Sequence, residues 1–325
     1  MVVKLPSDTS WTLLAWGYEK GGETEAGEMA AVIVDLDTSE AEISRLKQDG
    51  HVVICYFSVG TSEPARSDYA RNKARFEAVK LKEMADWPEE YWLDISSDEL
   101  KSLMEERFEL AASKGCDGVE PDNVDCYDNT ECREELSSSK EDVKEIQEEY
   151  NKWQIEIAHD LDLAIGLKNS LDLVDALVND YDFAVSESCL EFKECGMYQP
   201  FFDQNKAVFH IEYAAGSCSA ALEFPTMTKS CDGDGNICEG EMVNCFTPDG
   251  VRINNDAGGG GLVGAAVAIL AVAVLVVGLY VRGRKLSPFG DDRHFGTTQV
   301  FRSPASSVLA SPASPEEAEP TRGNP

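Results

Sequence analysis

The sequence predicts an α/β fold, a (β/α)8 TIM-like barrel over residues 1–213. Two observations predict it. Short apolar runs of strand length alternate with stretches whose apolar residues recur at helical spacing. Most of these runs also end in polar or ionisable residues, which is typical of the carboxyl ends of barrel strands. An open doubly wound sheet is the alternative, although no G-x-G-x-x-G follows an early strand to indicate a dinucleotide site.

The eight predicted strands are short apolar runs, of which His51–Gly60 is the clearest. It is continuous and rich in β-branched and aromatic residues, which is typical of a strand buried on both faces. From the second strand onward, most neighbours are separated by a predicted helix. The strands lie near residues 11–17, 30–35, 51–58, 92–95, 116–120, 163–167, 183–187 and 207–213.

The predicted helices combine capping residues with helical periodicity. Ser97 precedes residues 98–113, in which apolar residues recur every three or four positions. The acidic insert 130–149 is predicted as a solvated loop that leads into a helix over 143–159. Shorter helices are predicted over 40–48 and 170–178.

The residues after the barrel carry a different pattern. Leu262–Val281 is a run of twenty residues without a charge, long enough to cross a bilayer as a helix. Arg282, Arg284 and Lys285 follow at once, and by the positive-inside rule the tail is then cytoplasmic. We expect a single-pass membrane protein with its barrel extracellular or lumenal and the lipid bilayer as a partner. The predicted segments are a Cys-rich extension over 214–253, a flexible linker over 254–261, a transmembrane helix over 262–281 and a disordered tail over 282–325.

The cysteines predict disulfides. All ten lie before residue 246, and an even number on one side of a membrane span indicates an oxidising compartment. Cys126 with Cys132, and Cys189 with Cys195, are plausible local pairs. Because the sequence has no C-x-x-C and its four His are scattered, we expect no metal and no cofactor. Residues 232–243 resemble the start of a calcium loop but lack its sixth-position Gly and its final acid.

The net charge is −32 and the pI is about 4.3. Nucleic acid is excluded as a partner, because its phosphates require Lys and Arg. An acidic surface favours a cationic ligand through long-range steering. The alternative is that the acidity only keeps the protein soluble.

The sequence around residue 120 indicates a site. Pro121 ends the fifth predicted strand, because proline cannot donate to a further ladder bond. Asp122, Asn123 and Asp125 follow, where the carboxyl end of a barrel strand carries chemistry. The alternative interpretation is an Asx-rich turn without function.

The other strand ends extend this site. A barrel brings such ends into one ring, and two opposed carboxylates without a metal set or a Ser–His pair indicate glycoside hydrolysis. Each residue has an alternative role: Tyr56 could be packing, Lys168 a charge-balancing partner, and Glu212 a residue that only holds its neighbours. The polar residues at these ends are Asp35, Asp37, Tyr56, Ser58, Asp94, Lys168, Asn169, Glu187, Glu212 and Tyr213.

Several strings in this chain resemble one known family in collinear order, from about Trp11 to Tyr213. They are V-I-C-Y-F-S-V-G (53–60), W-P-E-E-Y-W-L-D-I (87–95), K-G-C-D-G-V-E-P-D-N-V-D (114–125), G-L-K-N-S (166–170), F-A-V-S-E-S-C (183–189), C-G-M-Y (195–198) and A-V-F-H-I-E-Y (207–213). Together they resemble the family-114 glycoside hydrolases, the endo-α-1,4-polygalactosaminidases. The N-terminal strand departs from the family pattern, and the resemblance does not cover the residues after Tyr213.

The resemblance implies a TIM-like barrel that hydrolyses α-1,4-linked galactosamine polymer with retention of configuration. It places the catalytic aspartate at Asp122 and the catalytic glutamate at Glu187, and we take Asp122 as the nucleophile and Glu187 as the acid/base. Retention predicts a separation of roughly 5–6 Å between the two carboxylates. The positions that look like substrate-binding ones are Asp35, Asp37, Tyr56, Lys168, Asn169 and Glu212; the ring adds Asp94, Asn123, Asp125 and Tyr213.

We therefore expect a membrane-anchored endo-glycosidase whose partner is a cationic amino-sugar polysaccharide. Two alternatives remain: a cell-surface barrel that binds a glycan without turnover, and a glycosidase for another amino-sugar polymer. A lectin has no need of both Asp122 and Glu187, which argues against the first alternative.

Overall fold

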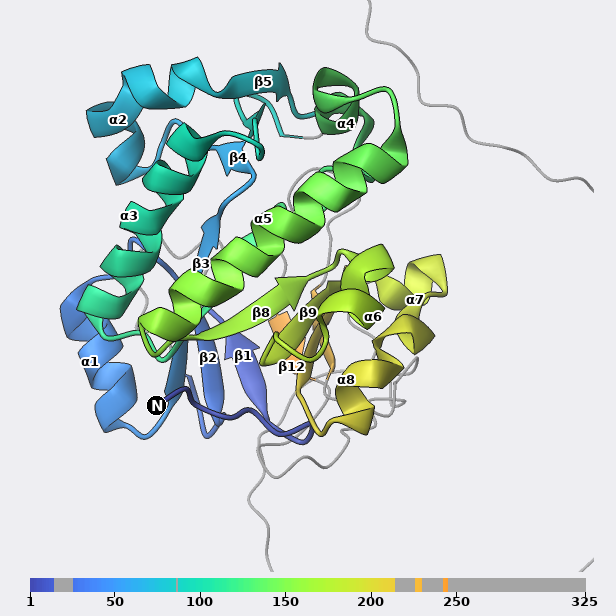
Figure 1. The fold of residues 1–325 in the computed structure, drawn as a ribbon. Helices are drawn as coiled ribbons and strands as arrows, with labels where there is room; N and C mark the ends of the chain where they lie inside the picture. The colour runs from blue at the N-terminus through green and yellow to red at the C-terminus, as the bar shows by residue number, and fades with distance from the viewer. Residues whose placement is uncertain (15–25, 86, 214–225, 230–241, 245–325) are drawn as a thin grey trace, which may run out of the picture. The chain divides into compact units, whose positions relative to one another are not determined.

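The computed structural model describes residues 1–14, 26–85, 87–213, 226–229 and 242–244, all of them in the unit Met1–Gly261 (Figure 1). The predicted linker, transmembrane helix and tail lie outside these residues, as does most of the Cys-rich extension. None of the helices in the described part of the chain has both the length and the apolar character for a membrane crossing.

The main sheet is parallel over most of its width. Every neighbouring pair runs parallel except the last, β11 with β12, which is antiparallel. The strand order is β1 (Trp11–Leu13), β2 (Ala31–Asp35), β3 (Val52–Ser58), β7 (Gly118–Asp122), β8 (Ala164–Lys168), β9 (Phe183–Glu187), β10 (Val208–Glu212), β11 (Thr226–Lys229) and β12 (Met242–Asn244). Seven of the eight predicted strands are therefore confirmed as members of this sheet.

The sheet curls like the wall of a barrel, so that its first strand approaches β10. The Trp11 ring stacks on Phe209 with centroids 4.9 Å apart, and Phe209 meets Phe183 at 5.4 Å. The amide of Ala207 also donates to the carbonyl of Leu5 at 2.9 Å. These residues belong to an inner core built from alternate residues of six strands. The predicted TIM-like class is confirmed at the level of this barrel-like parallel sheet.

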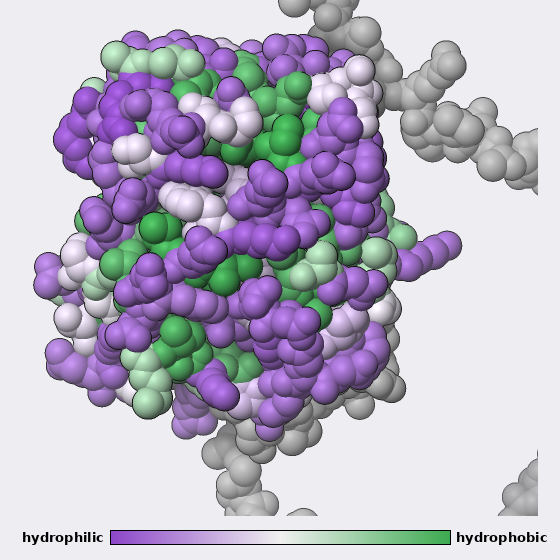
Figure 2. Space-filling view, viewed as in Figure 1, coloured by the Kyte–Doolittle hydropathy of each residue, from purple (hydrophilic) through white to green (hydrophobic). Residues whose placement is uncertain are grey.

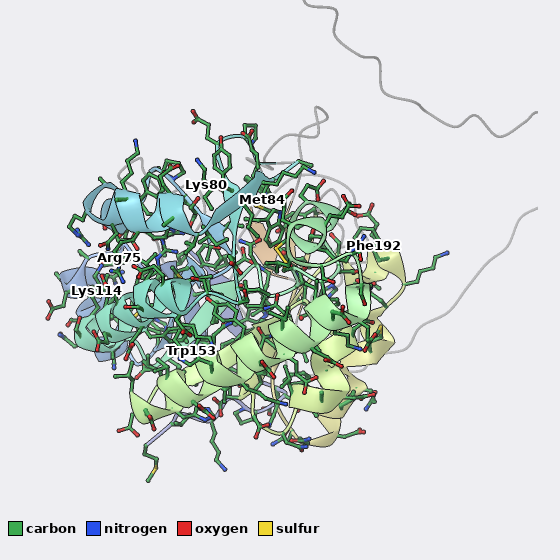
Figure 3. All side chains as sticks on the ribbon, turned by 45° about the horizontal axis from the view of Figure 1, so that its top comes forward. Arg75, Lys80, Met84, Lys114, Trp153 and Phe192 are labelled. Carbon is green, nitrogen blue, oxygen red and sulfur yellow. A yellow bond between two sulfur atoms is a disulfide. The ribbon has the colours of Figure 1, made fainter. Side chains whose placement is uncertain are left out.

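Helices cover the outer face of the sheet, and Figure 1 shows α5 crossing in front of β3, with β8 beginning beside the lower end of the helix. Phe57 on the outer face of β3 packs edge-on against Phe108 at 5.2 Å, and Trp153, labelled in Figure 3, stacks on Tyr150 at 5.5 Å. The helices are α1 (Glu40–Gln48), α2 (Ser67–Ala78), α3 (Asp98–Lys114), α4 (Thr130–Leu136), α5 (Lys140–Asp160), α6 (Val174–Leu177), α7 (Cys189–Phe192) and α8 (Gln199–Asp203), with 3-10 turns η1 (Leu171–Leu173) and η2 (Cys195–Tyr198). The face shown in Figure 2 is mainly hydrophilic, in keeping with the acidic composition.

The fourth predicted strand, 92–95, is wrong as a barrel strand. The corresponding β6 (Tyr91–Leu93) instead pairs antiparallel with β4 (Thr61–Ser62) and β5 (Lys80–Glu83) in a separate small sheet. Strand β3 lies directly beside β7, and the parallel position after β10 is taken by β11. A short apolar run carries no information about its pairing partner. For this reason the prediction from the sequence placed this strand in the wrong sheet.

The acidic insert also differs from its prediction, because it is largely helical. Helix α4 and the first turns of α5 occupy residues predicted as a solvated loop. The hydroxyl of Ser139 accepts a hydrogen bond from the amide of Asp142 and caps α5. Acidic residues in the first turn are favourable beside the positive end of the helix dipole.

Three disulfides join the described cysteines. The predicted pairs Cys126–Cys132 and Cys189–Cys195 are confirmed. The third, Cys55–Cys116, links β3 to the turn before β7 across a sequence separation of 61. This bond therefore fixes the two strands whose carboxyl ends open onto the site.

Candidate active site

The carboxyl ends of the parallel strands bring their inward-facing side chains together. On β9, Phe183 and Val185 belong to the inner core, so Glu187 two residues later faces the same side. The same alternation applies to β3, where Ile54 belongs to the inner core and is followed by Tyr56. In this way the sheet collects side chains that are far apart in the sequence: Asp35, Tyr56, Asp122, Lys168, Glu187 and Tyr213.

Lys168 lies at the centre of this group. Its Nζ is 3.2 Å from an Asp122 oxygen, 3.3 Å from a Glu187 oxygen and 3.4 Å from a Glu120 oxygen. Only 2% of the lysine side chain is exposed. Burial alone would lower the pKa of Lys168, but the three carboxylates hold it well above its usual value, so the group is a cation.

Asp122 is held as a carboxylate. Its Oδ2 accepts a hydrogen bond from the Tyr56 hydroxyl at 2.8 Å, and its Oδ1 accepts from the Asn123 amide at 2.9 Å. Burial raises the pKa of Asp122, but the charge of Lys168 and these donors outweigh burial and leave it below its usual value. An ionised, well-oriented carboxylate can act as a nucleophile.

Glu187 comes from β9, the neighbour of β8 on the side away from β7 and Asp122. One of its oxygens accepts from the Tyr213 hydroxyl, and the other accepts from Asn169 Nδ2 at 3.2 Å. The Glu187 amide in turn donates to Asn169 Oδ1 at 2.9 Å, which locks the two residues together. Asp122 and Glu187 remain 18% and 20% exposed, so both carboxylates are open to a substrate.

The distances through Lys168 limit how far apart the two carboxylates can be. The nearest oxygens of Asp122 and Glu187 can be separated by no more than the sum of their distances to Nζ, about 6.5 Å. This limit lies at or below the range of roughly 6.5–9.5 Å that is typical of inverting glycosidases.

The residues after Asp122 form part of the same site. Asn123 takes a left-handed backbone conformation with φ of 59°, which Asn tolerates well. Its Nδ2 donates to Ser58 Oγ at 2.9 Å and to Thr61 Oγ1 at 3.1 Å. Burial raises the pKa of the nearby Asp125 to about 7, assisted by the charge of Asp122.

Asp35 and Asp37 lie at the end of β2, beside Arg66. The guanidinium of Arg66 contacts both oxygens of Asp35, at 3.1 and 3.2 Å, and also pairs with Glu63. It lies 5.7 Å from the centre of the Tyr56 ring. Asp37 is exposed and accepts from the Ser67 hydroxyl at 3.0 Å.

Two predicted site residues are not brought into this group. Asp94 follows β6 in the small sheet, where its Oδ1 accepts from the amide and hydroxyl of Ser96. Glu212 lies on the outer face of β10, where its Oε1 accepts from the Leu190 amide at 2.8 Å and contacts His210. It thus holds the segment that follows β9.

Sequence reasoning missed four charged residues near Asp122: Glu63, Arg66, Glu90 and Glu120. Glu120 could have been found, because it precedes Asp122 by two positions on one strand and therefore shares its face. The other three come from the small sheet and its loops, and nothing local in their sequence points to the site. Burial raises the pKa of Glu90 to about 7, together with the charges of Glu63 and Asp122.

One cluster of residue types that bind metals occurs in the described part of the chain, on the outer side of β10. It contains Cys189, Cys195, His210 and Glu212. The two sulfurs are joined in a disulfide, and only a reduced thiolate binds zinc. Burial lowers the pKa of His210 to about 3, so this imidazole is neutral. In this state the cluster braces the segment after Glu187 rather than offering a metal site.

Comparisons with known proteins show the family and the fold. A protein-family model described as glycoside-hydrolase family GH114 matches residues 2–243. The crystal structure of Aspergillus fumigatus Ega3 in complex with galactosamine aligns at 29% identity and a TM-score of 0.62, covering 75% of this chain and 97% of that one. The glycoside hydrolase domain of PelA from Pseudomonas aeruginosa, at 13% identity and a TM-score of 0.50, covers 65% and 85% and shares the fold. Among curated proteins, none matches the chain.

Proposed function

The chain belongs to glycoside hydrolase family GH114, and on this premise we propose that it cleaves α-1,4-linked galactosamine polymers from within, as a retaining endo-glycosidase. The family match confirms the resemblance drawn from the sequence. The proposal for the substrate is supported by the Ega3 structure, which contains galactosamine and aligns over most of both chains. The mechanism rests on one observation: Asp122 and Glu187 both lie close to the ammonium group of Lys168, at 3.2 and 3.3 Å from its Nζ.

In the first step, a carboxylate oxygen of Asp122 attacks the anomeric carbon while Glu187 gives its proton to the glycosidic oxygen. The carbon–oxygen bond to the leaving chain breaks, and a covalent glycosyl–enzyme bond forms. In the second step, Glu187 takes a proton from a water molecule whose oxygen attacks the same carbon and releases Asp122. Two displacements at one carbon restore the original configuration.

The neighbouring side chains prepare these two acids. Lys168 and Tyr56 stabilise the negative charge of Asp122, so that it is ready to attack. Tyr213 and Asn169 fix the orientation of Glu187. Proton transfer depends on this orientation, because an acid must lie within hydrogen-bond reach of its target.

The charge around the site supports a cationic sugar. Galactosamine without an acetyl group is an ammonium ion, and Asp35, Glu63, Glu90 and Asp125 lie around the Asp122 side of the site. The pKa values of Glu90 and Asp125 are raised to about 7 because burial and neighbouring negative charge disfavour ionisation there. A bound ammonium group relieves that repulsion. We accordingly assign substrate contacts to Asp35, Asp37, Tyr56, Asn123, Asp125, Asn169 and Tyr213. Lys168 is only 2% exposed and acts on the substrate through the two acids that it contacts.

A membrane anchor completes the proposed function. The twenty-residue apolar run 262–281 and the basic residues after it support a single-pass topology with the enzyme domain extracellular or lumenal. The test is membrane fractionation of the full chain and of a variant without residues 262–281. Anchoring requires that the full chain sediments with membranes after a carbonate wash and that the deletion variant is released.

The activity is tested with the full chain and partly deacetylated galactosamine polymer. We expect oligosaccharide release by the unmodified protein, and a loss of at least about 10³-fold for Asp122→Asn and for Glu187→Gln. Glu109→Gln, at an exposed position on α3, removes the same charge far from these acids and is the control. Proton NMR of the first product should show the α-anomer, and a β-anomer would exclude retention.

Two other results would replace the proposal. Polymer binding without release by the unmodified protein would indicate a non-catalytic glycan-binding barrel. Release from a different amino-sugar polymer alone would indicate a glycosidase with another substrate.

A further inference from the structure

Glu120 is a third carboxylate on Lys168, and the proposed cleavage does not use it. It lies on β7 two residues before Asp122 and points to the same side of the sheet. Only 2% of its surface is exposed, and its Oε1 lies 3.4 Å from Lys168 Nζ. It is therefore part of the charge balance of the site without being able to reach a substrate.

The three carboxylates around Lys168 have very different hydrogen-bond partners. Asp122 and Glu187 each accept hydrogen bonds from two further groups. Glu120 pairs only with Lys168 among the described residues, and its Oε2 is fully buried without a hydrogen-bond partner there. A buried carboxylate oxygen without a donor is costly when it carries a charge and much less costly when the group is neutral.

The charges of the cluster also favour a neutral Glu120. One ammonium group faces three carboxylates, and full ionisation would leave two uncompensated negative charges in a buried site. The groups that face Glu120 are Lys168 from β8, Asp122 on its own strand and Glu187 from β9, with Tyr56 as its register partner on β3. Burial raises the pKa of Glu120 to about 7. The charges of Asp122 and Glu187 also raise this pKa, whereas the charge of Lys168 lowers it.

Resting on the hydrolysis proposed above, we propose that Glu120 is a positioning residue that holds a proton in the active enzyme and so leaves the charge of Lys168 to Asp122, the acid that must be ionised for attack. In this state Glu120 contacts the ammonium group of Lys168 but places no negative charge beside it. Above about pH 7 the proton is lost and Glu120 adds a further negative charge beside Lys168. This charge changes the electrostatic environment of both Asp122 and Glu187.

The first test measures stability and requires no substrate. Glu120→Gln mimics the neutral acid, and its melting temperature is compared with that of the unmodified protein from pH 4 to 9. In the unfolded chain Glu120 ionises near pH 4.5, whereas in the folded protein it ionises near pH 7. As the pH rises between these values, the unfolded chain releases the Glu120 proton and the folded protein keeps it, so the unmodified protein becomes less stable. The Glu120→Gln variant has no such proton and loses no stability at this site. The melting temperature of Glu120→Gln relative to the unmodified protein should therefore rise from pH 4.5 to 7 and then level off.

The proposal is wrong if the melting temperature of Glu120→Gln relative to the unmodified protein stays constant or falls between pH 4.5 and 7. That result would mean that an ionised Glu120 stabilises the fold by pairing with Lys168. Glu109→Gln, which removes an exposed charge from α3, is the matched control and should show no such rise. This result stands whether or not the protein cleaves galactosamine polymer.

The second test measures kcat against pH on the polymer. Glu120→Gln should keep kcat within about threefold of the unmodified enzyme below pH 6, because amide and neutral acid are then alike. The ratio of the two kcat values should change above pH 7. A constant ratio at every pH overturns the proposal, since a residue with a purely structural role would give it.

If Glu120→Gln does not fold, carbon-13 NMR of glutamate carboxyl groups in the unmodified protein decides the question. Two carboxyls should titrate near pH 7, since the pKa of Glu90 is also raised to about 7. Glu90→Gln should remove one of them. If no carboxyl titrates near pH 7 in that variant, the proposal is wrong.

Discussion

At the scale of single residues, Lys168 carries the charge balance of the site. It lowers the pKa of Asp122 although burial acts in the opposite direction. Its own three carboxylate contacts are all within 3.4 Å, and nearly all of its surface is buried. A change at this residue should therefore alter the protonation of Asp122, the proposed nucleophile, as well as the stability of the fold.

We predict that Lys168→Met moves the acidic limb of the activity profile to higher pH by about 1–3 units. Without the ammonium charge, the pKa of Asp122 rises, and a higher pH is needed to ionise it. The free energy of unfolding at pH 7 should also fall by about 3–5 kcal/mol, because buried carboxylates lose their cation. Kinetics from pH 4 to 9 and urea unfolding measure both effects.

Lys152→Met is the control for this variant. Lys152 also pairs with a carboxylate, Glu148 at 2.6 Å, but on the exposed side of α5. Its replacement should leave both the pH profile and the unfolding midpoint nearly unchanged, because exposed ion pairs contribute little. An unshifted acidic limb in Lys168→Met would show that Asp122 does not depend on this ammonium group.

Tyr213→Phe should lower kcat/KM by about 5–30-fold, the effect of losing about 1–2 kcal/mol of hydrogen bonding. The variant removes the hydroxyl that donates to Glu187 and leaves the ring in place. Tyr69→Phe, whose hydroxyl donates to Glu77 on α2, is the matched control and should retain full activity. Equal activities of the two variants would contradict the role assigned to Tyr213.

At the scale of elements, the close approach of the turn after β3 to the end of β7 depends on Gly60. A Cβ at this position would lie 1.9 Å from the carbonyl oxygen of Asn123. The backbone that carries Asp122 and Asn123 can therefore adopt its position only if residue 60 has no side chain.

We predict that Gly60→Ala reduces kcat by more than tenfold, because Asn123 must move and Asp122 moves with it. The overpacking should also lower the free energy of unfolding by about 1–3 kcal/mol. Gly196→Ala is the control, since a Cβ there would meet nothing within 4 Å. A fully active Gly60→Ala enzyme would mean that the position of Asn123 is not required for hydrolysis.

The disulfides should differ in their contribution to stability. Replacing Cys55 and Cys116 with Ala opens a loop with a sequence separation of 61 and should cost about 4 kcal/mol. Replacing Cys126 and Cys132, separated by 6, should cost about 2 kcal/mol, because a shorter loop loses less entropy on closure. Urea unfolding of the two double variants gives the order, and the reverse order would contradict loop entropy as the main contribution.

At the scale of the whole molecule, the net charge of −32 should act on a cationic substrate over long distances. We predict that raising the ionic strength from about 0.05 M to about 0.5 M lowers kcat/KM for the deacetylated polymer, as the screening length shrinks. The same polymer after N-acetylation is neutral, so its kcat/KM should not depend on salt in this way. Equal salt dependence for the two polymers would show that the acidic surface does not steer the substrate.

The sequence by itself determined the features that arise from local physics. The continuous run of β-branched and aromatic residues in β3 indicated a buried strand, and the polar residues that end the strands were readable from the order of the chain. The pairs Cys126–Cys132 and Cys189–Cys195 were readable because cysteines so close along the chain can meet without any knowledge of the fold.

Only the tertiary structure decided which segments become neighbours. It placed β6 in a separate sheet, put β3 beside β7, and turned Glu212 to the outer face of β10. It also brought Glu120 to Lys168, and Arg66 to Asp35. The physical reason is that strand pairing and ion pairing depend on distances set by packing of the whole sheet, and the sequence around each residue does not contain those distances.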